Sequence, residues 1–381
     1  MPRQFKLPNY EQLSKDQDKF GRWDGRGTKL VIGGPGTGKT TVALLLAKKM
    51  SNIHRKCLCL MFNNTLKHMS SQLTQRNTTV NTWHRWFCNF YQKQYKKYPP
   101  ELNRWKYDWD EIEKKYLDNN NIISKDNKTL LIIDEGQDFP IQFYTFIKYH
   151  FSNILITADE NQVITDNHSR VEEIAKCLEV SDDSIIDLTH NFRNTLQIAC
   201  LGHHFYSQNV SKPTFADEVE REGEVPQLVK YNEFDKVIQF IVKRFLDYPN
   251  RLIGVIVNGH KDRERYYHAI QEFVSQYKEN TRKIYTFASG KSNNEINYSD
   301  GGIAVFCAQS CKGLEFDDVF IGDLNTYFFH LEKRKEFRSK MYVLITRAIE
   351  MLFILYNTNN PNSNILNEFP DDKDLLNIKE N

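Results

Sequence analysis

Short apolar runs bounded by polar residues alternate with stretches of helix-like spacing along the first half of the chain. An apolar run of a few residues is typical of a strand that is buried on both faces of a parallel sheet. Together with a helix-like segment at 41–50, these runs predict a parallel-sheet α/β domain. The predicted strands are 30–32, 57–62, 129–133, 154–157 and 183–188.

The second half of the chain repeats this alternation and predicts a second parallel-sheet domain. We expect residues 1–190 to form the first domain, with a polar segment at about 92–128, and residues 191–356 to form the second. Residues 357–381 are polar and rich in Asn, so we expect a loosely ordered tail with at most a short docking helix at 371–376. The strands predicted in this half are 226–231, 252–257, 283–287, 302–308, 319–324 and 351–356, and the helices are 234–245 and 261–277.

Composition sets limits on this picture. The length of 381 residues suits two domains, and 51 Lys and Arg against 49 Asp and Glu give a net charge of +2. A nearly neutral chain has no global attraction for nucleic acid, so any such binding must rest on local patches. The 7 cysteines form no Cys-x-x-Cys pair, and several lie in strand-like runs, which favours buried thiols in a reducing compartment. No apolar run approaches the length of a membrane span, so we expect a cytoplasmic protein.

A glycine-rich loop follows the first predicted strand and precedes the first helix. Glycines let main-chain N–H groups approach phosphate oxygens, a lysine reaches the outer phosphates, and a threonine hydroxyl can bind Mg²⁺. A plain turn between strand and helix requires neither the lysine nor the threonine. The loop therefore predicts a nucleoside triphosphate site. Its residues are Gly33, Gly34, Pro35, Gly36, Thr37, Gly38, Lys39, Thr40 and Thr41.

Polar side chains follow two later strands of the first domain. Asp134 and Glu135 come directly after the strand at 129–133. Asp134 can hold Mg²⁺, and Glu135 can orient and deprotonate the attacking water. Gln162 follows the strand at 154–157, at the carboxyl edge where open α/β sheets bind ligands, so its amide is a candidate sensor of the γ-phosphate.

Three further side chains have both a functional and a plain interpretation. Gln17 precedes the loop, and its amide can pair with a bound base, but alone it is most often a surface glutamine. Arg193 and Arg347 are candidate arginine fingers, because a planar cation offsets the charge on a transferring phosphoryl group. The plain alternative is a surface arginine for the first and a helix cap or a surface ion pair for the second.

The segment 78–91 carries a dense aromatic cluster with Arg85 among its members. Core packing is the default explanation, because part of the cluster has helical spacing. Exposed aromatic rings beside an arginine are also typical of base stacking. These residues alone do not choose between the two interpretations. The members are Trp83, His84, Trp86, Phe87, Phe90 and Tyr91.

Taken in order, these motifs resemble those of superfamily 1 helicases of the UvrD/Rep type. The resemblance runs from Gln17 to Ala348 and implies two RecA-like parallel-sheet domains of the P-loop NTPase class, with Mg²⁺ and ATP at their interface. It also implies 3′→5′ movement along single-stranded DNA. The matching motifs are Gln17, the glycine-rich loop and the segments 134–138, 158–162, 191–193, 309–317 and 343–348.

The resemblance also assigns roles to single residues. Gln17 matches the residue that reads adenine, Phe192 matches the aromatic residue that stacks on adenine, and Glu315 matches the residue near the ribose. The remaining matches favour nucleic-acid contact for at least part of the aromatic cluster. These residues are Phe62, Asn63, Thr82, Trp83 and His84.

This chain departs from the family in two respects. The large insertions that help family members to open duplex DNA look reduced or missing, and residues 163–168 stand where the family has an aromatic pair. We therefore expect an ATP-dependent DNA helicase or translocase, and keep one alternative from another class. This alternative is an ATP-gated nucleic-acid sensor that recruits a nuclease or another effector, for example in bacterial antiviral defence. RNA stays an alternative substrate.

Overall fold

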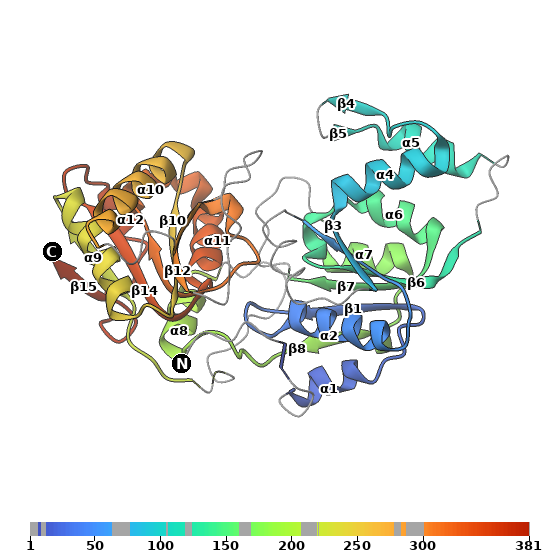
Figure 1. The fold of residues 1–381 in the computed structure, drawn as a ribbon, viewed down its shortest axis with the longest axis horizontal. Coiled ribbons are helices and arrows are strands. Elements are labelled where there is room, and N and C mark those ends of the chain that lie inside the picture. Colours follow the sequence, from blue (N-terminus) through green and yellow to red (C-terminus); the bar gives the residue numbers. More distant parts are fainter. Residues whose placement is uncertain are drawn as a thin grey trace. The chain divides into compact units, whose positions relative to one another are not determined.

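The computed structural model describes residues 7–8, 13–62, 77–103, 106–118, 124–159, 169–206, 219, 221–277, 283–286 and 301–380. The chain divides into two compact units (Figure 1). Lys6–Thr189 forms the N-terminal unit, and His190–Asn381 belongs to the C-terminal unit. Each unit is built around its own parallel sheet, which confirms the predicted fold class.

The described strands of the N-terminal unit form a 6-stranded sheet in the order β3-β2-β6-β7-β1-β8. Helices α1 and α2 lie on one side of this sheet, and α4, α5 and α6 lie on the other (Figure 1). The strands are β1 (Thr28–Gly33), β2 (Cys57–Met61), β3 (Thr78–Thr82), β6 (Asp126–Ile133), β7 (Phe151–Ala158) and β8 (Ile185–Leu188). The helices are α1 (Lys15–Gly21), α2 (Lys39–Asn52), α4 (Trp83–Tyr95), α5 (Trp109–Leu117), α6 (Ile141–His150) and α7 (Val171–Leu178).

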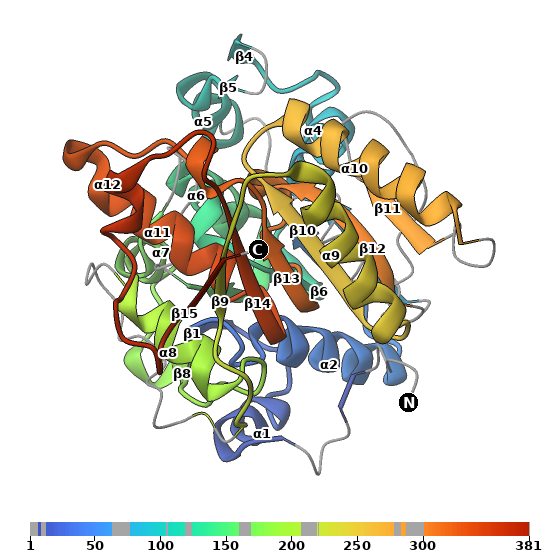
Figure 2. The same ribbon diagram turned by 90° about the vertical axis from the view of Figure 1, so that its left-hand side faces the viewer.

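The C-terminal unit has a 7-stranded sheet in the order β11-β12-β10-β13-β14-β9-β15. Helices α9 and α10 cover one face, and α8 and α11 lie on the other (Figure 2). The strands are β9 (Gln227–Tyr231), β10 (Leu252–Val257), β11 (Ile284–Thr286), β12 (Gly302–Cys307), β13 (Phe316–Ile321), β14 (Ala348–Asn357) and β15 (Asn377–Glu380). The helices are α8 (Leu196–His204), α9 (Phe234–Asp247), α10 (His260–Ser275), α11 (Arg334–Ile345) and α12 (Ser363–Leu366).

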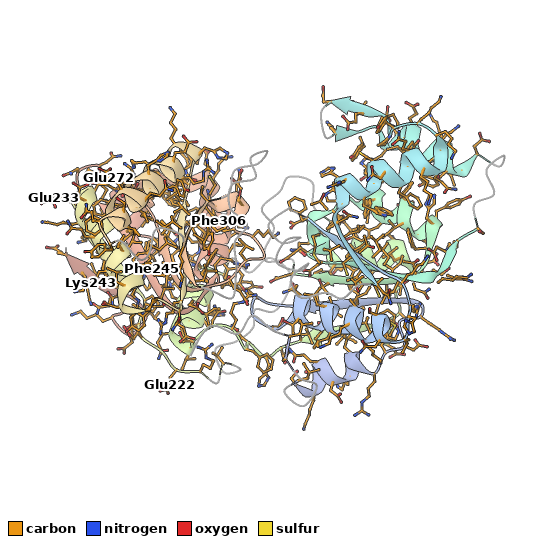
Figure 3. The ribbon with its side chains drawn as sticks, in the orientation of Figure 1. Glu222, Glu233, Lys243, Phe245, Glu272 and Phe306 are labelled. Atoms are coloured by element: carbon orange, nitrogen blue, oxygen red, sulfur yellow. The ribbon has the colours of Figure 1, made fainter. Side chains whose placement is uncertain are left out.

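Helices α9 and α10 of the C-terminal unit form where apolar residues recur at helical spacing. Phe245 of α9 is fully buried against the sheet, whereas Lys243 of α9 and Glu272 of α10 are exposed (Figure 3). An apolar stripe of this kind buries one side of a helix and leaves charged residues on the other. The helices predicted at 234–245 and 261–277 are thus present as α9 and α10, and α10 ends at Ser275, two residues before the predicted end.

Residues 342–345 form the last turn of α11, which places Arg347 between this helix and β14. The expectation of a loosely ordered tail was wrong, because residues 377–380 form β15, which pairs in parallel with β9. All four β15 side chains are exposed, so main-chain pairing forms the strand without an apolar pattern. Residues 371–376 are not helical.

The polar segment at 92–128 contains regular structure as well. It holds β4 (Glu101–Asn103), β5 (Lys106–Tyr107) and α5, which packs against α6. Within the described ranges, no helix combines the length and the apolar character that spanning a membrane requires.

Candidate nucleotide-binding site

The glycine-rich loop lies between the end of β1 and the start of α2, as predicted. Gly36 and Gly38 have φ of 79° and 84°, in the left-handed region that favours glycine. A Cβ atom on Gly33 would lie 2.6 Å from Oγ1 of Thr37 and 2.7 Å from the carbonyl oxygen of Leu188 on β8. The main chain of the loop therefore packs too closely against its neighbours for a larger residue at Gly33.

Lys39 begins α2, and its ammonium group is held by the protein. Its Nζ donates to the carbonyl oxygens of Gly33 at 2.7 Å and Gly34 at 2.9 Å. Nζ also lies 3.6 Å from Oδ2 of Asp159, which follows β7. The side chains of Lys39 and Asp159 are only 7% and 1% exposed. A buried ammonium group of this kind is stabilised because carbonyl oxygens and a carboxylate surround it.

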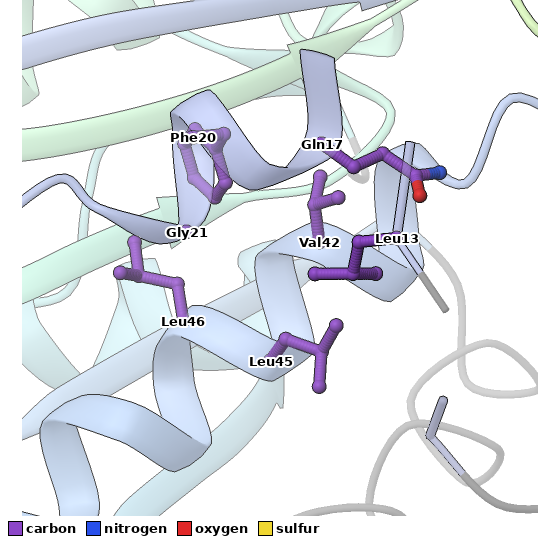
Figure 4. A pocket seen from close by; sticks show the side chains of 7 residues that line it. All are labelled: Leu13, Gln17, Phe20, Gly21, Val42, Leu45 and Leu46. Atoms are coloured by element: carbon purple, nitrogen blue, oxygen red, sulfur yellow. The ribbon is translucent and has the colours of Figure 1, made fainter. Parts of the chain in front are cut away.

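Gln17 lies on α1, outside the glycine-rich loop, and its side chain binds the main chain of the loop. Its Nε2 donates to the carbonyl oxygen of Thr37 at 2.9 Å, and its Oε1 accepts from the main-chain N–H of Ser14 at 3.1 Å. We expected the amide to pair with a base, and the structure shows both of its groups in contact with the main chain. The side chain also lines a small pocket between α1 and α2 (Figure 4). The other lining residues are Leu13, Phe20, Gly21, Val42, Leu45 and Leu46.

Asp134 follows β6 and contacts the loop helix directly. Its Oδ2 accepts from the Thr40 hydroxyl at 2.8 Å, and its Oδ1 accepts from the Thr157 hydroxyl. Burial raises the pKa of Asp134 to about 6, and the neighbouring Glu135 adds to this rise. The hydrogen bonds from Thr157 and Thr40 and the charge of Lys39 act in the opposite direction.

The structure thus brings the two predicted metal ligands, Thr40 and Asp134, into direct contact. Within the described residues, no group of three or more His, Cys, Asp or Glu side chains could hold a metal ion. A hydroxyl and one carboxylate nevertheless fit Mg²⁺, which usually takes one or two carboxylates and completes its shell with waters and phosphate oxygens.

Glu135 is the next residue, and it has φ of 56°, which is rare for a side chain of this type. Its Oε2 accepts from Nε2 of Gln137 at 2.7 Å, and Oε1 of Gln137 accepts from the main-chain N–H of Asp159 at 2.9 Å. Gln137 is fully buried. It therefore links the candidate catalytic carboxylate to the end of β7. Sequence reasoning missed Gln137, Thr157 and Asp159, although two of them lie within the quoted motifs.

Four of the predicted nucleotide residues lie in the C-terminal unit. Nε of Arg193 lies 2.8 Å from Oε2 of Glu315, and both side chains are partly exposed. Arg347 is buried, and it donates to the carbonyl oxygens of Val343 at 3.0 Å and Leu314 at 3.2 Å. Phe192 is 42% exposed.

Asn194 joins these residues, because its Nδ2 donates to the carbonyl oxygen of Thr346 at 3.2 Å, next to Arg347. The two candidate finger residues are therefore anchored in one connected cluster of the C-terminal unit.

The aromatic cluster of α4 lies mainly in the core of the N-terminal unit. Trp83 is only 5% exposed, and its ring packs against Phe139, Phe143 and Tyr107. Nδ1 of His84 lies 3.2 Å from the Tyr107 hydroxyl, and burial lowers the pKa of His84 to about 4.

Two more of the residues matched to strand contact are half-buried. Phe62 packs beside Phe139, and Thr82 precedes α4. The structure thus supports core packing for most of the cluster, and contact of its members with a nucleic-acid strand stays a prediction. Asn63 and Gln162 lie outside the described residues.

Comparison with known proteins agrees with the position of the loop. Residues 25–167 match the model of a family described as an AAA domain. This match includes the glycine-rich loop and the segment 134–138, and it indicates nucleotide binding. No curated protein matches the chain.

Solved structures also match, among them the C-terminal domain of a possible DNA helicase from Lactobacillus plantarum WCFS1. This structure is 19% identical, with a TM-score of 0.36, over 50% of this chain and 99% of that chain. A likeness of this degree supports no statement about function.

Proposed function

We propose that the chain is a Mg²⁺-dependent ATP hydrolase that acts on single-stranded nucleic acid as a helicase or translocase of the UvrD/Rep type. One observation carries the hydrolase part of this proposal. The Thr40 hydroxyl of the glycine-rich loop donates to Asp134 at 2.8 Å, and Glu135 follows at the same edge of the sheet. This arrangement unites groups for phosphate, metal and water within the segment that matches an AAA domain.

Each residue of this site has a distinct task in the proposed reaction. Lys39 leaves its carbonyl partners and binds the outer phosphates, while the loop N–H groups bind the remaining phosphate oxygens. Thr40 and Asp134 would hold Mg²⁺, which neutralises charge on the phosphates when bound. Glu135 orients the attacking water and takes its proton. Gln137 positions Glu135 through the 2.7 Å hydrogen bond.

The remaining groups proposed for nucleotide binding are Gln162 of the N-terminal unit and Arg193, Arg347, Phe192 and Glu315 of the C-terminal unit. We assign Arg193 and Arg347 to the γ-phosphate as arginine fingers, and Gln162 to the same phosphate as a sensor. Phe192 stacks on the adenine, and Glu315 contacts the ribose. The exposure of Phe192, at 42%, supports its role because the ring is accessible to a ligand.

The proposal of 3′→5′ movement along DNA is based on the order of the motifs and on the residues that they contain. An ATP-gated sensor that recruits a nuclease or another effector is the second candidate. The small size of the segment between α4 and β6 favours it, since the described residues there form only β4, β5 and α5. A chain without large accessory insertions has fewer elements with which to open a duplex.

ATP hydrolysis by the purified chain, with and without single-stranded DNA, tests the proposal. Lys39→Ala should abolish hydrolysis by removing the phosphate ligand, whereas Lys48→Ala, an exposed position on the same helix, should retain it. Glu135→Gln should abolish hydrolysis but still bind ATP. Hydrolysis at the wild-type rate in Lys39→Ala or Glu135→Gln would contradict the site assignment.

Strand displacement on a tailed duplex separates the two candidate functions. Unwinding by the purified chain would remove the sensor alternative, and DNA-stimulated hydrolysis without unwinding would favour it. Competition between DNA and RNA oligomers in the hydrolysis assay identifies the preferred strand.

A further inference from the structure

We propose that Asp159 is a counterion for Lys39 in the nucleotide-free protein, and that the outer phosphates of a nucleotide must displace it. The inference rests on the proposed function, because it takes the loop to be a nucleotide site. It adds a residue that sets the affinity of this site, through a charge that competes with the ligand.

The contacts of Lys39 show that its ammonium group is already bound by the protein. A lysine ammonium group has three donors and no acceptor. Two carbonyl oxygens of the loop, those of Gly33 and Gly34, lie within hydrogen-bond distance of Nζ, and the Asp159 carboxylate lies 3.6 Å away. The ammonium group that is expected on the phosphates is thus already surrounded by protein groups. A nucleotide has to replace these partners before it gains the lysine.

The position of Asp159 carries the second step. Its main-chain N–H donates to Gln137 at 2.9 Å, and the preceding strand β7 lies between β6 and β1 in the sheet. Asp159 is therefore fixed to the carboxyl edge of the sheet, and it cannot simply move away with Lys39. Its side chain is 1% exposed, so water screens it poorly.

Two electrostatic effects of the Asp159 charge then lower the affinity for a nucleotide. Lys39 loses a buried ion pair when it moves to a phosphate, and a phosphate that approaches Lys39 is repelled by the Asp159 charge. Asp159→Asn removes both effects and preserves the shape of the side chain. We expect this variant to bind ATP and ADP roughly tenfold more tightly, which is a modest share of the Coulomb interaction at this distance.

Equilibrium titration with fluorescent methylanthraniloyl derivatives of ATP, ADP and AMP tests this inference. AMP lacks the outer phosphates, so its affinity should not change in Asp159→Asn. Asp187→Asn is the matched control, because it removes one exposed carboxylate from β8 in the same unit. Lys39→Met, alone and combined with Asp159→Asn, completes a double-mutant cycle in which the gain should shrink.

The results separate this inference from the proposed function. If the wild type binds none of the three probes, the proposed function fails. If the wild type binds ATP but Asp159→Asn binds it equally well or more weakly, the inference alone fails. An equal gain in the Lys39→Met background would also overturn it. Asp159→Ser provides a second neutral variant in case Asp159→Asn does not fold, and it should show the same preference for ATP over AMP.

Discussion

Asp134→Asn should make the metal-free protein more stable at neutral pH, although it removes a proposed metal ligand. The pKa of Asp134 is raised to about 6 from its ordinary value of 3.8, mainly because the carboxylate is buried. The folded protein therefore pays a free-energy cost for ionising this group that the unfolded chain does not. Asparagine has a similar shape and carries no charge.

The sign of the effect follows from proton binding. Between about pH 4 and pH 6 the folded protein holds a proton on Asp134 that the unfolded chain has lost, so the free energy of unfolding falls as pH rises through this window. A shift of this size corresponds to about 3 kcal/mol. Asparagine is a poorer hydrogen-bond partner for the two threonine hydroxyls, which lowers the gain in stability by about 1 kcal/mol. We expect Asp134→Asn to be more stable than the wild type by about 2 kcal/mol above the window, and less stable by about 1 kcal/mol near pH 4, where only the poorer hydrogen bonding remains.

Urea unfolding followed by tryptophan fluorescence measures the difference in the free energy of unfolding for the N-terminal unit, which contains Asp134. All five tryptophans, at 23, 83, 86, 105 and 109, belong to the N-terminal unit. The comparison is made in EDTA at about pH 4.5, 6 and 7.5, with Asp187→Asn as an exposed control. Mg²⁺ with ATP should then stabilise the wild type more than the variant. The reasoning is refuted if Asp134→Asn is no more stable than the wild type at the highest pH, or if its advantage does not depend on pH.

Two further predictions concern the C-terminal unit. A Cβ atom on Gly254 would lie 2.5 Å from the Phe316 ring, so Gly254→Ala should destabilise this unit by about 1 to 3 kcal/mol. Unfolding followed by circular dichroism should detect this loss of stability. Unfolding followed by tryptophan fluorescence should not, because the tryptophans lie in the N-terminal unit. An unchanged circular dichroism transition would contradict it. Glu315→Gln removes the charged partner of Arg193, and because both side chains are partly exposed we expect a loss of at most about 1 kcal/mol, similar to that of Glu350→Gln, which breaks the pair with Arg221. A much larger loss in urea unfolding would show that the Arg193 pair holds the fold together.

The sequence predicted the buried strands and the glycine-rich loop well, because both depend on local signals. Apolar runs such as those of β6 and β10 become central strands whatever surrounds them. Strand β3 was missed, since its sequence is polar and its side chains are only partly buried. Strand β15 was missed for a related reason, because its pairing with β9 involves the main chain.

The candidate site could be predicted from the sequence only where a residue lies in a motif that indicates its chemical role. Lys39, Thr40 and Asp134 stand in recognisable motifs, and in the structure the Thr40 hydroxyl, next to Lys39 at the start of α2, donates to Asp134. Asp159 lies in the quoted segment 158–162 but received no role, because its contact with Lys39 depends on the adjacency of β7 and β1 in the sheet. The burial of Trp83 was likewise set by tertiary packing, since the aromatic pattern suited a core and a stacking surface equally well.

The close packing at Gly33 has a mechanical consequence. Gly33 pairs with Leu188, and the division between the two units follows directly after Thr189. The chain therefore leaves the N-terminal unit beside the phosphate loop, with main chain against main chain. Because this contact leaves no free space, we expect a displacement of the connecting segment to shift the loop, and a change in the loop to shift the connecting segment.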